Sequence, residues 1–219
     1  MRFSLQLALI LPLLLSACKS EPDQGQLDAS AKIFLDSGGT ALLNTASHNY
    51  GLPCLDSLEL DGTRLSSGIL FGNRSALVDF IERHRLAKTT HERLPDGADH
   101  VILTPVVPYE ANWQAGSAGS SNFCLGFDLL KAEAVPDAKT ITAGASEPYI
   151  IQGSEAIATR LTFKVTGIPG GDFLDDLKRR PNLLTRGAMR PSDYDKEITL
   201  VATLPLKPSS FIPPIIQTK

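Results

Sequence analysis

The sequence predicts an α+β fold, with short helices and hairpins in the N-terminal half, followed by an antiparallel sheet with one or two packed helices. Three observations support this prediction. Apolar residues recur at helical spacing in the first half, strands of alternating polarity dominate from Phe123 onward, and Asp-Gly pairs separate short runs of strand-forming residues. Alternation with one polar face is typical of an antiparallel sheet that is half exposed to solvent.

Two helices and a short turn are predicted before residue 90. Residues 27–35 have apolar side chains near helical spacing and are followed by a Ser-Gly-Gly stop, and residues 40–43 predict a further short turn. The clearest helix covers residues 73–86, with Ser75 as its N-cap. Its apolar stripe includes His84, which is therefore expected at the edge of the core with a hydrogen-bond partner.

Two hairpins are predicted in the same half. Residues 57–66 turn at an Asp-Gly pair, and residues 88–107 turn at Pro-Asp-Gly. A helix followed by a two-stranded wing resembles the winged helix of DNA-binding domains. Its basic residues are matched one for one by acids, which argues against that use: the bases are Arg74, Arg83, Arg85, Lys88 and Arg93, and the acids are Asp79, Glu82, Glu92, Asp96 and Asp99.

Long strands and one helix are predicted in the C-terminal half. Residues 123–129, 157–166 and 198–204 alternate between apolar and polar side chains, and the second of these is the clearest strand in the sequence. Residues 172–180 predict a short helix, because Asp172 can cap it, acids fill its first turn, bases fill its last, and a proline follows.

Two segments are predicted to lack regular structure. Residues 114–122 have no side chain larger than Gln or Asn, which indicates a flexible loop or internal linker. The tail from Pro205 contains several further prolines and is expected to run extended over the surface.

Residues 1–17 have the pattern of a secretory signal. Arg2 supplies a positive charge, residues 5–15 are almost entirely apolar, and Ser16 and Ala17 are the small residues that a signal peptidase accepts. The apolar run is shorter than the roughly 20 residues that a membrane-spanning helix needs. We therefore expect the segment to be removed from the mature chain.

The end of this segment, Leu15-Ser16-Ala17-Cys18, resembles the lipobox of bacterial lipoproteins. The resemblance implies that the Cys18 thiol receives a diacylglycerol, that cleavage makes Cys18 the N-terminus, and that acyl chains such as palmitate then modify its amine. Two or more acyl chains anchor a protein stably to a bilayer. Lys19, in place of an aspartate, implies the outer membrane, although in some bacteria Lys and Ser near this point act as retention signals. The alternative is an ordinary cleavage site with an incidental cysteine.

A second and fainter resemblance concerns the mature chain. Glu147-Pro148, Gly153 and the amphipathic strand after them, behind a strand that contains a cysteine, are similar to a pattern in uncharacterised envelope lipoproteins. This likeness implies an α+β module and carries no known activity.

Composition limits the domain count and the classes of partner. Loss of residues 1–17 from the 219 leaves 202, which suits one domain or two small ones. The removed piece carries one charged residue, Arg2, so the formal net charge changes from −3 to −4. A mildly acidic chain lacks the clustered positive charge that nucleic-acid binding requires, and that class is excluded.

The remaining cysteines, Cys54 and Cys124, are predicted to form a disulfide. They are an even pair once Cys18 is lipidated, and an oxidising periplasm favours their pairing. The loop that they close is long, and the chain-entropy model gives such a bond about 4 kcal/mol. The alternative, a reactive thiol, has neither a Cys-X-X-Cys partner nor a basic setting in the sequence.

No catalytic, metal-binding or cofactor-binding residue is assigned. Asp36-Ser37-Gly38-Gly39 resembles the nucleophile loop of trypsin-like proteases, but the mature chain has no histidine before it, and a helix stop is predicted instead. One hypothesis places His91 and His100 opposite each other across the second hairpin, where they would bind a metal weakly or sense pH. No spacing in the sequence fixes a third ligand. The acids of residues 193–197 are interpreted as a solvated turn.

The predicted organisation has five parts: a signal peptide at 1–17, a lipidated flexible stalk at 18–26, a helix- and hairpin-rich part at 27–113, a flexible loop at 114–122, and a strand-rich part with a Pro-rich tail at 123–219. The Cys54–Cys124 bond is expected to join the two larger parts.

The predicted function is that of an envelope lipoprotein, anchored to the membrane by its lipid, that serves as a non-enzymatic binding or structural module with an envelope protein as its partner. Two alternatives stay open. One is an envelope hydrolase whose site is assembled from remote residues such as His84, Ser37 and an acid. The other is an immunity or inhibitor lipoprotein that protects its host from a periplasmic toxin. The sequence does not define the oligomeric state.

Overall fold

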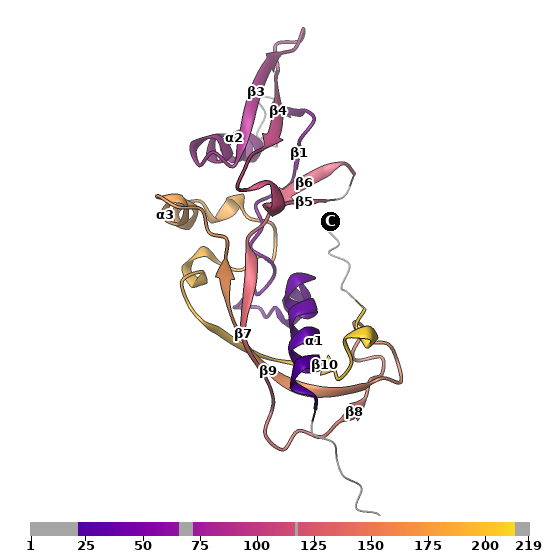
Figure 1. The fold of residues 1–219 in the computed structure, drawn as a ribbon. Helices are drawn as coiled ribbons and strands as arrows, with labels where there is room; N and C mark the ends of the chain where they lie inside the picture. Colours follow the sequence, from indigo (N-terminus) through magenta and orange to yellow (C-terminus); the bar gives the residue numbers. More distant parts are fainter. Residues whose placement is uncertain (1–21, 66–71, 117, 213–219) are drawn as a thin grey trace, which may run out of the picture.

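The computed structural model describes residues 22–65, 72–116 and 118–212. It confirms the α+β class, with helices packed against antiparallel sheets. The molecule is elongated, with the β3–β4 hairpin at one end and β8 at the other (Figure 1). The predicted signal peptide and Cys18 lie outside the described residues.

The largest sheet has the strand order β10-β9-β7 and confirms the three predicted C-terminal strands in outline. It consists of β7 (Gly126–Ala134), β9 (Glu155–Thr166) and β10 (Ile198–Pro205), with the short β8 (Ile141–Thr142) also paired to β9. All pairings are antiparallel.

Along β9 the predicted alternation holds, because every second side chain is buried: Ile157, Thr159, Leu161, Phe163 and Val165.

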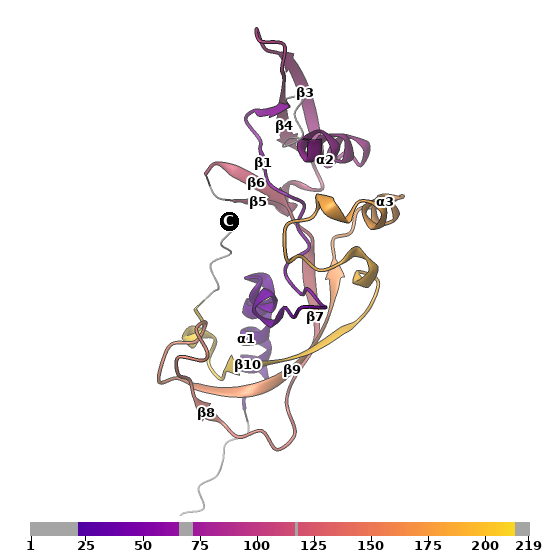
Figure 2. The same cartoon turned by 180° about the vertical axis from the view of Figure 1, so that it is seen from behind.

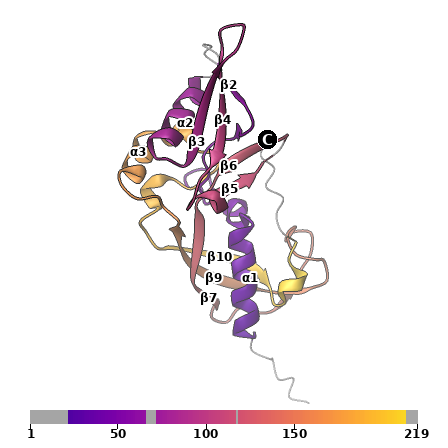
Figure 3. The ribbon, with the colours of Figure 1, turned by 45° about the horizontal axis from the view of Figure 1, so that its top comes forward.

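Helix α1 (Gln24–Asp36) packs on one face of this sheet (Figure 3). Its end confirms the predicted helix stop, since Gly38 adopts a left-handed conformation with φ of 71°. Its start corrects the predicted stalk. The Asp23 carboxylate accepts a hydrogen bond from the Gln26 amide, which caps the helix before Gln24, so residues 24–26 are helical. A short 3₁₀ turn, Gly39–Leu43, follows as predicted.

The predicted hairpin at 57–66 is wrong. The two strands exist, as β1 (Leu58–Glu59) and β2 (Thr63–Leu65), but they enter different sheets. Strand β1 pairs with β6, and β2 pairs with β4, because each strand finds its partner far along the chain. The Asp-Gly pair between them therefore forms a turn that joins two sheets.

The second predicted hairpin is confirmed, and the predicted flexible loop is not. Strands β3 (Ala87–Arg93) and β4 (Asp99–Pro105) pair antiparallel around the Pro-Asp-Gly turn.

Residues 114–122 are largely a second hairpin of β5 (Trp113–Ala115) and β6 (Ser120–Phe123). Strand β6 pairs with β1 as well as with β5, and the buried Asn122 side chain holds it further by donating a hydrogen bond to the Leu55 carbonyl.

Helices α2 (Gly72–Arg83) and α3 (Phe173–Arg179) lie next to each other (Figure 2). The apolar stripe predicted on α2 is confirmed, since Leu77, Phe80 and Ile81 are buried. The predicted N-cap is wrong, because the helix begins three residues before Ser75. Three of the remaining short 3₁₀ turns are Glu110–Asn112, Pro181–Leu183 and Pro191–Asp193.

The predicted Cys54–Cys124 disulfide is present. It lies between two segments that already pair through their backbones, where the Leu55 amide donates to Phe123 and the Leu125 amide donates to Pro53. A third segment also pairs here, because the Thr185 amide donates a hydrogen bond to the Cys54 carbonyl. Buried residues from both large parts of the chain form one continuous hydrophobic cluster around this point.

The start of the tail is packed and not extended over the surface. A 3₁₀ turn at Pro208–Ser210 leads to Phe211, which is buried against the rings of Phe34 and Tyr149. These aromatic contacts draw the segment onto the core and correct the prediction as far as residue 212. In the part of the chain that the structure describes, no helix is long and apolar enough to cross a bilayer.

Candidate functional site

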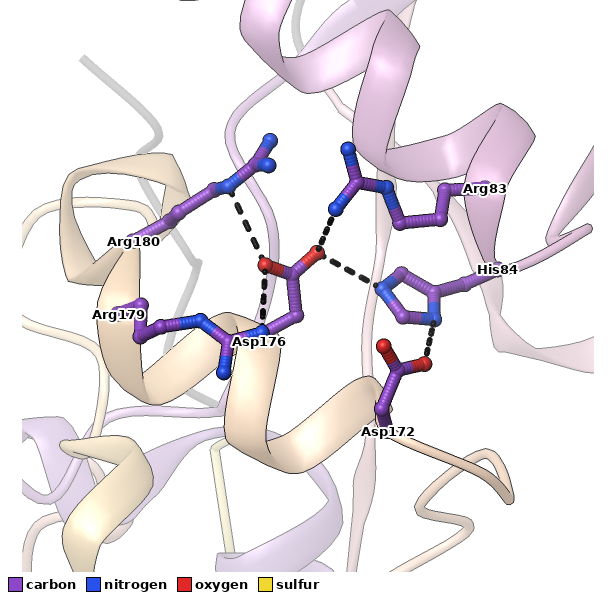
Figure 4. Close-up of polar contacts among 6 residues, drawn as sticks. All are labelled: Arg83, His84, Asp172, Asp176, Arg179 and Arg180. Atoms are coloured by element: carbon purple, nitrogen blue, oxygen red, sulfur yellow. Dashed lines mark hydrogen bonds and ion pairs between the residues drawn. The ribbon is translucent and has the colours of Figure 1, made fainter.

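A cluster of charged side chains lies where the C-terminal end of α2 meets α3 (Figure 4). Helix α2 and the residue after it supply Arg83 and His84. Helix α3 and its flanks supply the rest: Asp172, Asp176, Arg179 and Arg180. Side chains four residues apart share one face of a helix, so Asp172, Asp176 and Arg180 all face α2.

Asp176 lies at the centre of this cluster and is the only carboxylate among the described residues that is fully buried. Its Oδ2 atom is 3.1 Å from His84 Nε2 and 3.5 Å from Arg83 Nη1. Its Oδ1 atom is 3.3 Å from Arg180 Nε and 3.4 Å from Arg179 Nη2. One carboxylate is therefore shared by an imidazole and three guanidinium groups.

Opposing effects act on the pKa of Asp176. Burial raises it, since a charged carboxylate loses its hydration. The hydrogen bonds from His84 and Arg179 and the positive charges of Arg180 and Arg83 lower it, and together they prevail, so the pKa lies below its ordinary value. The group is accordingly an anion at neutral pH and balances part of the positive charge around it.

His84 is held between two carboxylates. Its Nε2 atom faces Asp176 and its Nδ1 atom lies 3.8 Å from Asp172 Oδ1. The ring also contacts Phe80 and Phe173, with centroid distances of 4.4 and 5.3 Å. Asp172 occupies the N-cap position of α3, as predicted, but its side chain makes no capping hydrogen bond and faces the imidazole instead.

A histidine beside a carboxylate is an arrangement that general bases use, but such a base must reach its substrate. The His84 side chain is 4% exposed, and both ring nitrogens face acids. The Ser37 hydroxyl, its partner in the hydrolase hypothesis, donates to the Phe34 carbonyl at the end of α1. The structure does not bring these two residues together, and the cluster joins α2 to α3 across 92 positions of sequence.

The other predicted histidine pair is also separated. In the β3–β4 ladder His91 lies opposite Val101, and His100 lies opposite Glu92, so the two rings project from opposite faces of the hairpin. His91 Nε2 is 2.7 Å from Glu82 Oε1, and this hydrogen bond, with one from Thr89, lowers the pKa of Glu82. The described residues contain no group of three or more potential metal ligands.

The acids of residues 193–197 form the turn that the sequence predicts. Lys196 is 2.7 Å from Asp193, whose hydrogen bond and charge raise the pKa of Lys196. The sequence does not reveal that Tyr194, within the same turn, is buried and donates its hydroxyl hydrogen to the Met189 carbonyl.

An open groove of about 580 Å³ runs between α1 and β7. Its walls carry both apolar and polar side chains, and several of the polar groups pair with each other along the groove. Gln24 donates from its amide to Asp28 and to the Ala132 carbonyl, and Lys131 lies 2.7 Å from Glu133.

Sequence reasoning placed His84 at the core edge with a partner but missed Asp176 as that partner. One signal was available, because Asp172, Asp176 and Arg180 recur at intervals of four on a short helix that also carries Arg179. Comparisons of the chain with protein-family models, with curated proteins and with solved structures find no match.

Proposed function

We propose that this chain is a lipid-anchored protein of the bacterial envelope, attached through Cys18 to the outer membrane on its periplasmic side, and that it acts as a non-enzymatic binding module. The lipobox-like residues before Cys18 support the anchor. The observation that carries the proposal is the start of α1, because Asp23 caps that helix only five residues after Cys18.

This short tether has a geometric consequence. Five residues span at most about 18 Å when fully extended. The lipid would therefore hold the start of α1 close to the bilayer. Figure 1 shows that start at the same end of the molecule as β8, while the β3–β4 hairpin lies at the far end. An anchored molecule would point its hairpin end away from the membrane.

Two features favour a rigid display of this kind. Asp176 links α2 to α3, and the Cys54–Cys124 bond lies within paired backbone segments. Both reduce motion between the end near the membrane and the end that projects from it. A rigid projecting module suits capture of an envelope protein, since little ordering entropy is lost on binding.

The test compares the native chain with Cys18→Ser in its host. We expect the native protein in the outer-membrane fraction and the variant in the soluble periplasmic fraction, with a crosslinked envelope protein recovered only with the native form. Equal partition of both forms would contradict the anchor. Turnover of a wall or lipid substrate by the pure domain would contradict the non-enzymatic role.

A further inference from the structure

The two edges of the main sheet differ in their protection. Natural edge strands are guarded by charges, bulges or covering elements, since their free backbone groups can pair with another chain. Strand β7 has all three: a bulge between Leu129 and Lys131, the charges of Asp128, Lys131 and Glu133, and α1, whose Gln24 donates to the Ala132 carbonyl.

Strand β10, at the opposite edge, has no charge, bulge or covering hydrogen bond over residues 198–202. Its residues are Ile-Thr-Leu-Val-Ala-Thr-Leu-Pro, without a charge, and its register with β9 is unbroken. The side chain of Val201 at its centre is 53% exposed. A long, uncharged and β-branched edge of this kind is the type to which a further strand adds.

The orientation of the β10 backbone follows from three observations. The Leu206 amide donates to Glu155 on the β9 side, so even-numbered positions face β9. The Thr203 carbonyl accepts from the Tyr149 hydroxyl, and Pro205 needs no amide partner, so odd-numbered positions face away.

Thr199 and Val201 therefore point their N–H and C=O groups to the open edge. No described residue outside the sheet bonds to these backbone groups. They can supply four hydrogen bonds to an added strand, two from each residue.

We propose that the edge of β10 over residues 198–202 binds an extended segment of an envelope protein by strand addition. This rests on the proposed function as a binding module and names the chemistry of its partner. The segment is uncharged and strand-forming where it faces residues 198–202, because no group on β10 there can pair with a charge.

The same segment carries a basic residue at its C-terminal end. In an antiparallel arrangement that position lies opposite Glu197, which is exposed and has no hydrogen bond or ion pair with any described residue. Its neighbours are already paired, since Lys196 binds Asp193 and Lys178 lies 3.9 Å from Asp195.

A second copy of this chain fits the edge less well than another protein. Antiparallel pairing of two β10 strands places a twofold axis perpendicular to the sheet. Helix α1 lies along the face of the sheet, so that axis reverses its direction (Figure 3). Two copies joined in this way would point their Cys18 tethers in opposite directions, which a single membrane does not accommodate.

The test uses the full mature chain in detergent and a labelled peptide, acetyl-Thr-Val-Thr-Val-Thr-Lys-amide, with binding followed by fluorescence polarisation. Val201→Pro removes one outward N–H group. Proline is tolerated at outward-facing positions of an edge strand, and Pro205 occupies such a position in native β10. We expect about tenfold weaker binding, because one hydrogen bond is lost and its acceptor is left unpaired. Val201→Thr keeps the amide and should bind within about twofold of the native chain.

A second pair of measurements covers the case in which Val201→Pro disturbs folding. Glu197→Lys should weaken binding of the Lys-ended peptide and strengthen binding of the same peptide ending in Glu. Hydrogen exchange of the native chain should show new protection at Thr199 and Val201 in the complex.

Absence of binding at millimolar peptide, protection on β7 instead of β10, or equal responses of native chain and Glu197→Lys to both peptides would overturn the proposal. None of these readouts involves Cys18. Failure here therefore leaves the membrane anchor standing. A Cys18→Ser protein that binds the peptide but stays in the outer-membrane fraction would refute the anchor while supporting the β10 site.

Discussion

Asp176 shows how a charge can be buried in a marginally stable fold. Taking a carboxylate out of water is costly unless it is paired and hydrogen-bonded. Here each oxygen faces two nitrogen atoms, and the residue itself is 1% exposed. The three arginine side chains are 30 to 64% exposed, so their other donors stay hydrated.

Asp176→Ala should destabilise the protein by about 2 to 3 kcal/mol, measured by urea unfolding at pH 7. This is less than the 3–5 kcal/mol typical of a broken buried pair, because the stranded arginines can hydrate. Asp175→Ala is the matched control, since Asp175 is exposed on the same turn, and should cost less than about 1 kcal/mol. Equal losses in the two variants would contradict a stabilising role for the contacts of Asp176 with His84 and the three arginines.

The lowered pKa of Asp176 also predicts a pH dependence. An acid whose pKa is lower in the folded state contributes its full stabilisation above its unfolded pKa of about 3.9. That contribution is lost as pH falls through the folded value. The stabilities of the native chain and of Asp176→Asn, measured by urea unfolding, should therefore differ at pH 7, and the difference should shrink as pH falls below the unfolded pKa of about 3.9. A constant difference from pH 7 to pH 2 would argue against this assignment.

At the scale of single elements, α1 depends on a cap that lies next to the proposed tether. Asp23→Ala removes the hydrogen bond to the Gln26 amide and should cost about 1 kcal/mol in urea unfolding. Asp36→Ala, at the exposed end of the same helix, loses only an ion pair with Lys32 and should change stability by less than about 0.5 kcal/mol. A larger effect at Asp36 than at Asp23 would place the cap elsewhere.

The turn between β1 and β2 requires glycine for space and not for a positive φ. A β-carbon at Gly62 would overlap the His100 imidazole at Nε2. Gly62→Ala should therefore cost about 1 to 3 kcal/mol, which His100→Ala in the same chain should largely restore. Gly144→Ala, which meets open space, is the control and should leave the melting temperature near that of the native chain. Additive losses in the double variant would refute this contact.

Elements governed by local chemistry could be predicted from the sequence, and elements governed by distant partners could not. The alternation of polarity along β9 and the glycine stop after α1 are both determined by residues close together in the sequence. The sheet to which β1 belongs is determined by its pairing with Ser120 and Ser121, some 60 positions away. No residue near β1 in the sequence indicates this pairing. For the same reason residues 114–122 looked flexible, although most of them pair as β5 and β6.

The same distinction holds for the candidate site. The stripe on α2 predicts His84 at the core edge, because helical period is local. The burial of Asp176 arises only when α3 packs against α2, and a short helix rich in charges otherwise indicates a solvated face. The unguarded edge of β10 likewise depends on strand order, which the alternation of polarity does not reveal.

At the scale of the whole molecule, we propose a rigid body that is tethered to the membrane at one end. One hydrophobic cluster, a central disulfide and the Asp176 contacts hold the described residues together. The lipid on Cys18 would fix which end faces the bilayer, and β10 would then take a strand from a neighbouring envelope protein. Location and binding are separable claims, and the first determines where the second can operate.

The most direct test of the central claim is the intact mass of the protein purified from its native host. We predict a chain that begins at Cys18 and carries the added mass of a diacylglyceryl group and an amide-linked acyl chain. A chain that still includes Ala17, or one that begins at an unmodified Cys18, would contradict it.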